Sequence, residues 1–171
     1  WNTVPEDYES DLVWYEGFQV DSSCIDELKA MVADCKAAGF LCNLSSAYRG
    51  YNYQNTLFQR KVNKLMDAGY SRSEAEAETA RSMAIPGTSE HQLGLAVDFN
   101  SVEDSFRNTK AYKWLIENCT DYGFILRYPN DKSEHTGIIY EPWHYRYVGK
   151  ELAAELKESE LCLEEYFESL S

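Results

Sequence analysis

Two short segments hold two of the three histidines of this 171-residue chain. The first covers residues 89–98, reads SEHQLGLAVD, and contains His91 and Asp98. The second covers residues 141–144, reads EPWH, and follows after about forty intervening residues. Two imidazoles, one ligating carboxylate and one further carboxylate are the usual components of a catalytic zinc site with an activated water. The two segments therefore predict a fold that brings them together around a metal ion.

The spacing of His91 and Asp98 requires the chain to turn between them. Side chains that bind one zinc ion lie within about 4 Å of one another. Seven residues would separate the two by about 10 Å along a helix and by about 23 Å along a straight strand. Gly94 offers a place for the turn, because glycine adopts unusual backbone angles at little cost. Residues 95–97 then predict a short buried strand with Asp98 at its far end.

Glu141 and His144 are three positions apart, so their side chains would point to opposite faces of a regular strand. Pro142 removes a backbone donor and disfavours a helix at Glu141. We therefore expect Glu141 at an irregular entry to a strand over residues 143–148, with His144 on that strand. Such an irregularity lets both side chains reach one metal ion.

The joint pattern resembles that of the VanY-type D-Ala-D-Ala metallopeptidases, whose signature is S-x-H-x-x-G-x-A-x-D followed by E-x-W-H. Every position of that signature is met here. The superfamily also holds lysostaphin-like endopeptidases and the hedgehog signalling domain. The resemblance further includes SAYR at residues 46–49, Gln54, GFILRYP at residues 123–129 and HYRYVG at residues 144–149, so it extends over roughly residues 25–168.

The resemblance implies roles for the residues of the two segments. His91, Asp98 and His144 are expected to bind Zn²⁺ and to leave a fourth position for water. Glu141 is expected to act as the general base, which takes a proton from the water and passes it to the leaving amine. The third histidine, His135, lies in a polar loop and is expected to be solvated.

A second group of residues is expected to bind the substrate. Arg49 could stabilise the oxyanion of the tetrahedral intermediate or hold a substrate carboxylate. Gln54 and Ser89 match family positions that contact the end of the peptide. Four aromatic residues are candidates either for the wall of the cleft or for the core: Tyr48, Tyr128, Tyr140 and Trp143. Arg127 and Arg146 are weaker candidates, since arginines on edge strands are more often solvated or paired with acids.

The remaining pattern predicts an α+β fold, with a small antiparallel sheet flanked by helices. The resemblance implies the same architecture. The length predicts a single catalytic domain over residues 1–171, and the acidic and aromatic residues 1–20 are expected to form an ordered arm packed on it. The expected helices cover residues 22–38 with Ser22 or Ser23 as cap, 51–68, 71–84 with a Ser71–Glu74 capping box, 109–120, and 150–170 with a break near Ser159. The expected strands cover residues 40–48, 95–98, 124–128 and 145–148.

Composition restricts the possible binding partners and the cellular compartment less than the motifs do. A net charge of −13 argues against a nucleic-acid partner. No run of about 18 apolar residues occurs, so we expect no transmembrane segment in this chain, although a leader or anchor upstream would lie outside it. The five cysteines form no C-x-x-C pattern; a local Cys35–Cys42 bridge and five buried thiols are the alternatives. Oligomeric state does not follow from the sequence.

The resemblance implies a zinc carboxypeptidase that removes the terminal D-Ala from peptidoglycan stem peptides, outside the bacterial cell or in its envelope. No residue decides between D,D- and L,D-carboxypeptidase activity, which differ by one residue of substrate. An endopeptidase that cuts within the stem peptide is the enzymatic alternative. A wall-binding module that keeps the zinc without catalysis is the non-enzymatic alternative, and the presence of Glu141 and Arg49 argues against it. A role in antibiotic resistance would depend on genetic context.

Overall fold

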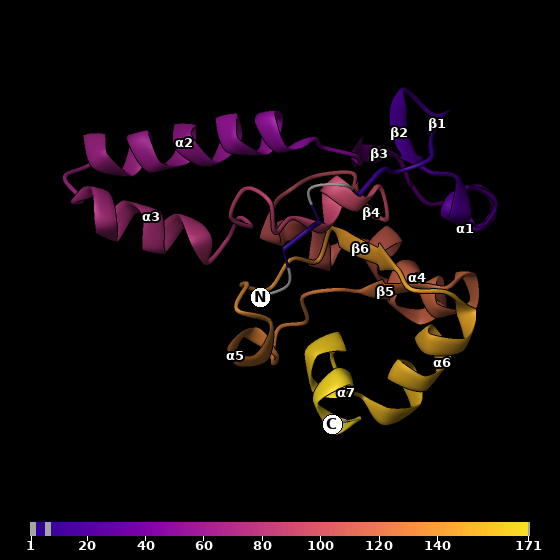
Figure 1. Cartoon of the computed structure of the whole chain (residues 1–171). Coiled ribbons are helices and arrows are strands. Elements are labelled where there is room, and N and C mark those ends of the chain that lie inside the picture. The colour runs from indigo at the N-terminus through magenta and orange to yellow at the C-terminus, as the bar shows by residue number, and fades with distance from the viewer. Residues whose placement is uncertain (1–2, 6–7, 171) are drawn as a thin grey trace.

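The computed structural model describes residues 3–5 and 8–170 of the chain. A four-stranded antiparallel sheet lies at its centre (Figure 1). The strand order is β3 (Leu44–Ser46), β4 (Ala96–Phe99), β6 (His144–Tyr147) and β5 (Phe124–Leu126). In this register Asp98 of β4 lies opposite His144 of β6. The pairing of segments far apart in the sequence therefore places the two motifs side by side.

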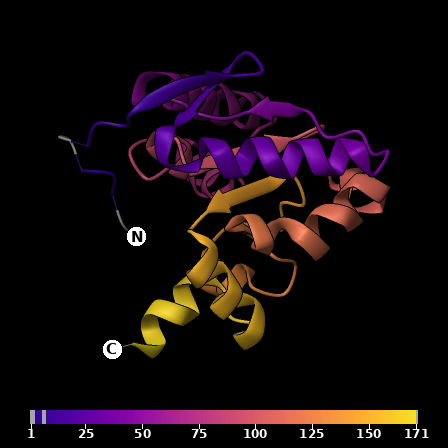
Figure 2. The ribbon, with the colours of Figure 1, turned by 90° about the vertical axis from the view of Figure 1, so that its right-hand side faces the viewer.

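Helices surround this sheet and form two outlying groups. Figure 2 shows α1 running alongside the sheet, and Figure 1 shows α2 and α3 packed on each other and projecting away from it. The C-terminal helices lie on the opposite side of the sheet from the β1–β2 hairpin (Figure 2). The helices are α1 (Ile25–Ala37), α2 (Tyr51–Asp67), α3 (Arg72–Ala80), α4 (Lys110–Asn118), α5 (Ser133–Thr136), α6 (Lys150–Ser159) and α7 (Leu163–Ser169).

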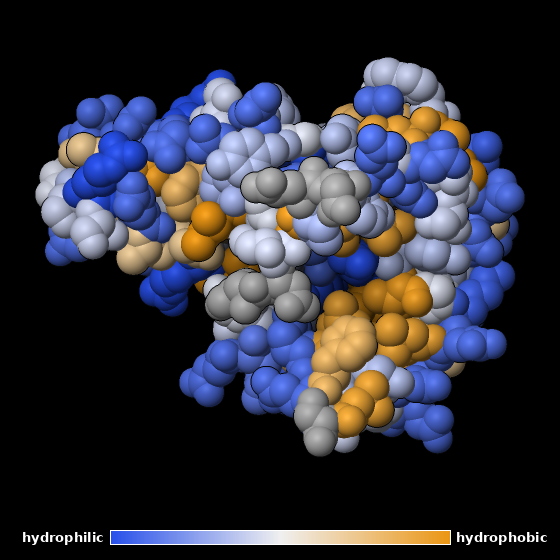
Figure 3. Space-filling model, in the orientation of Figure 1, coloured by the Kyte–Doolittle hydropathy of each residue, from blue (hydrophilic) through white to orange (hydrophobic). Residues whose placement is uncertain are grey.

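Three hydrophobic clusters hold these parts together. The largest joins α1 to the sheet and α4, through Leu28, Val97 and Leu115 among others. A second, smaller cluster lies between α2 and α3. A third joins β5 to α6 and α7, and Figure 3 shows hydrophobic surface gathered over the C-terminal helices on an otherwise mostly hydrophilic face. The C-terminal helices are thus attached to the sheet by apolar packing as well as by the polar contacts described below.

The expected arm contains a hairpin of β1 (Leu12–Tyr15) and β2 (Phe18–Asp21). Val13 and Phe18 pack on the main cluster, whereas Trp14 is 70% exposed. The hairpin touches the first motif, because the Asp21 amide donates to the Gly94 carbonyl (2.9 Å). Residues 1–2 and 6–7, which include Trp1 of the expected arm, lie outside the described part of the chain.

Most of the expected elements are present, and the α+β prediction is confirmed. The Ser71–Glu74 capping box begins α3, and the C-terminal helix breaks after Ser159. Three local predictions are wrong. Asp21 caps the turn before α1, instead of Ser22 or Ser23, because its carboxylate accepts from the Ser23 amide. The strand expected over residues 40–48 is only β3, because its pairing with β4 is irregular. The helix predicted to reach residue 84 ends at Ala80.

Two further expectations concern thiols and the membrane. All five cysteines are free and buried, so the structure has small buried thiols and no Cys35–Cys42 bridge. Over residues 3–5 and 8–170, no helix combines the length and apolar character needed to cross a bilayer.

Candidate metal centre and substrate cleft

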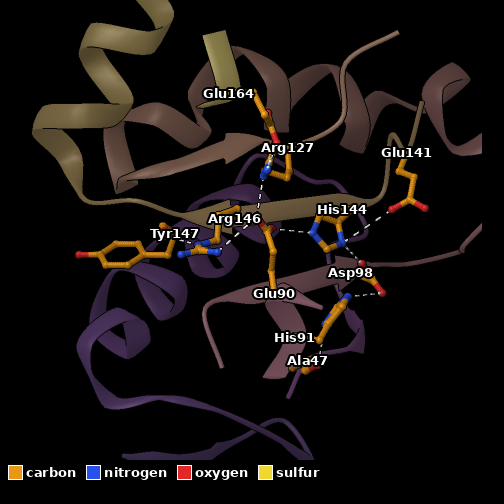
Figure 4. A network of polar contacts seen from close by, with 10 residues as sticks. All are labelled: Ala47, Glu90, His91, Asp98, Arg127, Glu141, His144, Arg146, Tyr147 and Glu164. Atoms are coloured by element: carbon orange, nitrogen blue, oxygen red, sulfur yellow. Dashed lines mark hydrogen bonds and ion pairs between the residues drawn. The ribbon is translucent and has the colours of Figure 1, made fainter. Parts of the chain in front are cut away.

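His91, Asp98 and His144 converge on one buried point (Figure 4). One potential ligand atom from each lies within 4.8 Å of the others, and all three residues are buried. Asp98 bridges the histidines, with Oδ2 3.4 Å from His91 Nε2 and Oδ1 3.0 Å from His144 Nδ1. Within the described part of the chain, no other trio of His, Cys, Asp or Glu side chains lies close enough to hold a metal.

The turn at Gly94 brings His91 back towards Asp98, as its spacing predicts. His91 lies in a single helical turn over Glu90–Leu93, and Gly94 ends that turn with a φ of +74°. A Cβ at Gly94 would lie 2.9 Å from the Asp21 amide nitrogen, so the β1–β2 hairpin also requires glycine there. The chain then enters β4, where Asp98 points to the centre. Asp98 lies inside this strand, one residue before its end.

Each histidine uses its outer nitrogen for a protein acceptor. His91 Nδ1 donates to the Ala47 carbonyl (2.7 Å), and His144 Nε2 donates to the Glu90 carboxylate (3.3 Å). A carbonyl can only accept, so the bond to Ala47 fixes the proton of neutral His91 on Nδ1 and leaves a lone pair on Nε2. The inner nitrogens, His91 Nε2 and His144 Nδ1, therefore face the centre.

This arrangement fits a bound metal ion. His91 Nε2 is buried without a hydrogen-bond partner in the described structure, which is unusual for a buried polar atom. Burial alone would raise the pKa of Asp98, but the neighbouring His91 and His144, the latter through a hydrogen bond, hold it well below its usual range. Two imidazoles and one ionised carboxylate are a donor set that suits Zn²⁺.

Without a metal, a proton can take the ion's place. Burial opposes the charged form of His144, yet hydrogen bonds to Asp98 and Glu90 raise its pKa to about 9. The proton on Nδ1 lies between His144 and Asp98, where a cation would be attracted as well. Metal and proton are therefore expected to compete for this nitrogen.

Glu141 lies beside the centre as the irregular strand entry predicts. Its Oε2 is 3.8 Å from His144 Nδ1. The His144 amide donates to the Glu141 carbonyl (3.2 Å), a tight turn across Pro142 that leaves both side chains on one side. Burial and, less strongly, the charge of Asp98 raise the pKa of Glu141 to about 7. A carboxyl group with that pKa can exchange a proton near neutral pH.

The His91, Asp98 and His144 trio and Glu141 line a cleft of about 470 Å³. Arg49, Gln54, Ser89 and Trp143 line it too, so the structure brings these four expected substrate residues together. Arg49 Nε and Gln54 Oε1 are buried without hydrogen-bond partners among the described residues. Gln54 is held by its other end, because its amide nitrogen donates to the Ala84 carbonyl (2.7 Å). The cleft therefore offers a free cationic donor and a free acceptor beside the metal ligands.

Tyr140 is not part of the cleft, although it was expected there. Its hydroxyl forms a hydrogen bond with the Tyr112 hydroxyl (2.8 Å), and it is absent from the lining. Of the other aromatic candidates, Tyr128 lines the cleft and Tyr48 does not. His135 lies on α5, and not in a loop. Its side chain is 44% exposed and 3.4 Å from Glu165, far from any metal-binding trio in the described structure.

Sequence reasoning missed Glu90 and Lys61. Glu90 occupies a variable position of the first motif, yet it contacts His144, Arg127 and Arg146. Arg127 and Arg146 were the available signal, because pairing with acids was one of the two outcomes expected for them. Such pairing requires a nearby carboxylate, and Glu90 provides it. Lys61 lines the far wall of the cleft and donates to the Ser82 hydroxyl. Nothing in its helical pattern distinguished it from a solvated lysine.

Comparisons with known proteins agree with this geometry. Residues 17–150 match the model of a family described as VanY, D-alanyl-D-alanine carboxypeptidase. A curated D-alanyl-D-alanine carboxypeptidase of Enterococcus faecalis (strain ATCC 700802 / V583) is 41% identical over 166 residues, which are 96% of this chain and 62% of the relative. The chain thus spans less than two thirds of that protein.

Two solved structures have nearly the same fold. VanYB in complex with D-Alanine-D-Alanine superposes with a TM-score of 0.91 at 40% identity, covering 99% of this chain and 94% of that one. A mutant of the vancomycin resistance D,D-pentapeptidase VanY from a VanB-type resistance cassette, in complex with Zn(II), superposes with a TM-score of 0.88 at 41% identity. That match covers 97% of this chain and 94% of the other.

Proposed function

The chain belongs to the VanY family of D-alanyl-D-alanine carboxypeptidases, and on that premise we propose that it is a zinc-dependent carboxypeptidase that removes the terminal D-Ala from peptidoglycan stem peptides. One observation carries the proposal. The His91, Asp98 and His144 trio opens onto the same cleft as Glu141, whose carboxylate lies 3.8 Å from His144. A metal site and a proton-transfer group thus share one substrate-sized cavity.

Zn²⁺ is the proposed cofactor, held by His91, Asp98 and His144. The donor set supports zinc, and so does the solved relative that contains Zn(II). Bound there, the ion would supply a Lewis acid that polarises the peptide carbonyl and acidifies water.

Glu141 is the proposed general base. Its carboxylate would take the proton of the attacking water and deliver it to the amine of the departing D-Ala. Burial supports this role, because it raises the pKa of Glu141 to about 7 and lets the group both accept and release a proton near neutral pH. A nearby cation would lower that pKa, so the basic form would dominate at neutral pH in the loaded enzyme.

Arg49, Gln54 and Ser89 are proposed to hold the end of the substrate. The substrate has a free C-terminal carboxylate, and Arg49 is a cation without a carboxylate partner within 4.0 Å among the described residues. The unpartnered Gln54 Oε1 can accept a peptide N–H. Arg49 could instead stabilise the oxyanion. Loss of that role would lower kcat, whereas loss of a contact with the substrate carboxylate would change KM. Trp143 would form part of the wall beside them.

The proposed substrate implies the setting. Stem peptides belong to the bacterial cell wall, so we infer that the protein acts in the cell envelope or outside the cell. The names of the Enterococcus faecalis relative and of the two VanY structures support D,D-specificity, whereas another solved neighbour is named an L,D-carboxypeptidase. The chain also spans only 62% of the Enterococcus faecalis protein, so substrate choice is part of the proposal.

Mass spectrometry of purified muropeptides tests this function. The zinc-loaded protein is incubated with pentapeptide stems and with tetrapeptide stems, and Glu141→Ala serves as control. Loss of one alanine from the pentapeptide alone is the expected result. Loss from the tetrapeptide would make the protein an L,D-carboxypeptidase, and cleavage within the stem would make it an endopeptidase. If neither stem changed while zinc stayed bound, the protein would be a binding module.

A further inference from the structure

Glu90 contacts the outer nitrogen of His144 and also belongs to a chain of ion pairs that is largely buried at Arg127 and ends at Glu164, 27% exposed, on the C-terminal helix. We propose that Glu90 is a positioning residue, and that the relay Glu164–Arg127–Glu90–His144 makes the ion pair between Glu164 and Arg127 a determinant of metal affinity. The proposal rests on the metal site of the proposed function and is independent of which peptide is cleaved.

Both oxygens of Glu90 are in use. Oε2 accepts from His144 Nε2 (3.3 Å), while Oε1 accepts from Arg127 Nε (2.6 Å) and lies 3.3 Å from Arg146 Nη1. The side chains of Glu90, Arg127 and Arg146 are 11%, 9% and 16% exposed. Carboxylates held in this way have little freedom to turn, because each oxygen is fixed by a different partner (Figure 4).

Arg127 carries the relay from the sheet to α7. Its guanidinium uses Nε for Glu90 and both terminal nitrogens for Glu164, with Nη1–Oε2 at 2.9 Å and Nη2–Oε1 at 2.5 Å. Glu164 lies in the first turn of α7. The two-pronged pair fixes the plane of the guanidinium, and the plane in turn fixes where Nε meets Glu90. Helix α7, which begins more than 60 residues after Asp98, thus orients the Glu90 carboxylate that contacts His144.

The formal charges of the four carboxylate and guanidinium side chains in the network sum to zero. Glu90 and Glu164 contribute two negative charges, while Arg127 and Arg146 contribute two positive charges. A buried ion pair tolerates poorly the loss of one partner, because the other charge stays in an apolar setting. Removing Glu164 would leave two arginines to compete for one carboxylate, and Glu90 would be drawn from His144.

The two histidine ligands are therefore supported by different means. The backbone carbonyl of Ala47 holds His91 and does not depend on any side chain. A side-chain relay holds His144 and depends on α7. Partners on the outer nitrogen of a ligating histidine fix its tautomer and ring orientation, and their loss costs about 10- to 100-fold in metal affinity.

Zinc affinity, measured by competition with a chromophoric chelator, tests the relay. We expect Glu90→Gln to weaken Zn²⁺ binding about 10- to 100-fold. Gln keeps the size of Glu and an acceptor for His144, but it loses the charge that holds the arginines. Glu164→Ala, farther from the metal, should weaken binding about 10-fold. The absorption spectrum of the Co²⁺-substituted protein should also change in both variants, since it reports coordination geometry.

Glu165→Ala is the matched control. Glu165 is the next residue on α7, pairs with Lys132 (2.8 Å) and caps the helix through the Cys162 amide (2.8 Å), but it has no contact with Arg127. We expect this variant to lose one ion pair and one cap of α7, but to keep the Glu164–Arg127 pair and the wild-type zinc affinity. Circular dichroism confirms that each variant is folded, and Glu164→Ala decides the question if Glu90→Gln does not fold.

Two kinds of result would overturn the proposal, and a third would overturn the proposed function. Wild-type zinc affinity in Glu90→Gln or in Glu164→Ala would refute the positioning role. Equal weakening in Glu164→Ala and Glu165→Ala would mean that loosening of α7, and not the relay, sets the affinity. Wild-type protein that binds no zinc would instead refute the proposed function, so the two failures are distinct.

Discussion

The two ring nitrogens of His144 face two differently built regions. On the Nδ1 side lies the cleft, where His91 Nε2, Arg49 Nε and Gln54 Oε1 have no hydrogen-bond partners in the described structure. On the Nε2 side lies Glu90, which also contributes to the cleft lining but has partners on both oxygens. Buried polar atoms are rarely left unpaired, so these three atoms beside His144 indicate the side that meets ligands. We therefore expect the paired side to support His144 and the unpaired side to meet the substrate.

The two glutamates beside His144 show the same contrast in their pKa values. Burial raises the pKa of Glu141 to about 7, because the charges of His144, Arg49 and Lys61 offset it only in part. Burial alone would raise the pKa of Glu90 too, but Arg127, His144 and Arg146 hold it far below its usual range. One carboxyl can therefore exchange a proton near neutral pH, while the other remains a fixed charge.

Replacing His144 should have the largest effect, because this residue carries both the nitrogen that faces the metal site and the nitrogen that contacts Glu90. His144→Ala leaves one imidazole and one carboxylate, so we expect loss of most bound zinc and of all measurable hydrolysis. Metal analysis after dialysis, with His135→Ala as control, checks this. Full zinc occupancy in His144→Ala would show that the metal lies elsewhere.

Replacing the Glu141 carboxyl should slow the reaction and leave the metal bound. Glu141→Gln is expected to lower kcat by about 10²- to 10⁴-fold while one equivalent of zinc stays bound. Release of D-Ala from a synthetic pentapeptide measures the rate, and atomic absorption measures the metal. Turnover within a factor of a few of the wild type would assign the base to another residue.

Arg49→Ala separates the two roles that its position allows. If Arg49 stabilises the oxyanion, kcat should fall by about 10²-fold. If it holds the substrate carboxylate, the change should be confined to KM. Steady-state kinetics distinguish the two, and a substrate with an amidated C-terminus sharpens the result, because it lacks the carboxylate. No change in either constant would remove Arg49 from the site.

The pH dependence of stability should show the smallest effect. The pKa of Glu141 is about 7 in the folded protein and near 4.5 when unfolded. Because the pKa is higher in the folded protein, the protonated Glu141 carboxyl stabilises the folded state fully below about pH 4.5. This stabilisation is lost as the pH rises through 7. In chelator, we expect the wild type to lose up to about 3 kcal/mol relative to Glu141→Gln between pH 5 and 9. Denaturant titrations at both pH values measure it; parallel curves would contradict it.

The sequence predicted the parts of the site that local constraints determine. The spacing of His91 and Asp98 required a turn, and Gly94 makes it with a positive φ. Pro142 required an irregular strand entry, and the Glu141–His144 turn is that irregularity. These features depend on covalent geometry and backbone sterics, which a short segment already contains.

The remaining features depend on tertiary packing. Glu90 acquires its place through Arg127 and Glu164, each 37 residues from the next, and no local pattern connects them. Tyr140 is turned away from the cleft by its bond to Tyr112, on α4. Asp21 caps the turn before α1 because the hairpin ends there, while the serines beside it have the same local propensity.

Anomalous diffraction at the zinc edge, from crystals of the zinc-loaded protein, tests the two-sided arrangement of His144 most directly. We expect one strong peak bound by His91 Nε2, Asp98 and His144 Nδ1, with Glu90 still on His144 Nε2. A peak on His144 Nε2 with Glu90 as a ligand, or a peak away from this trio, would contradict the assignment of one side to the metal and the other to the protein.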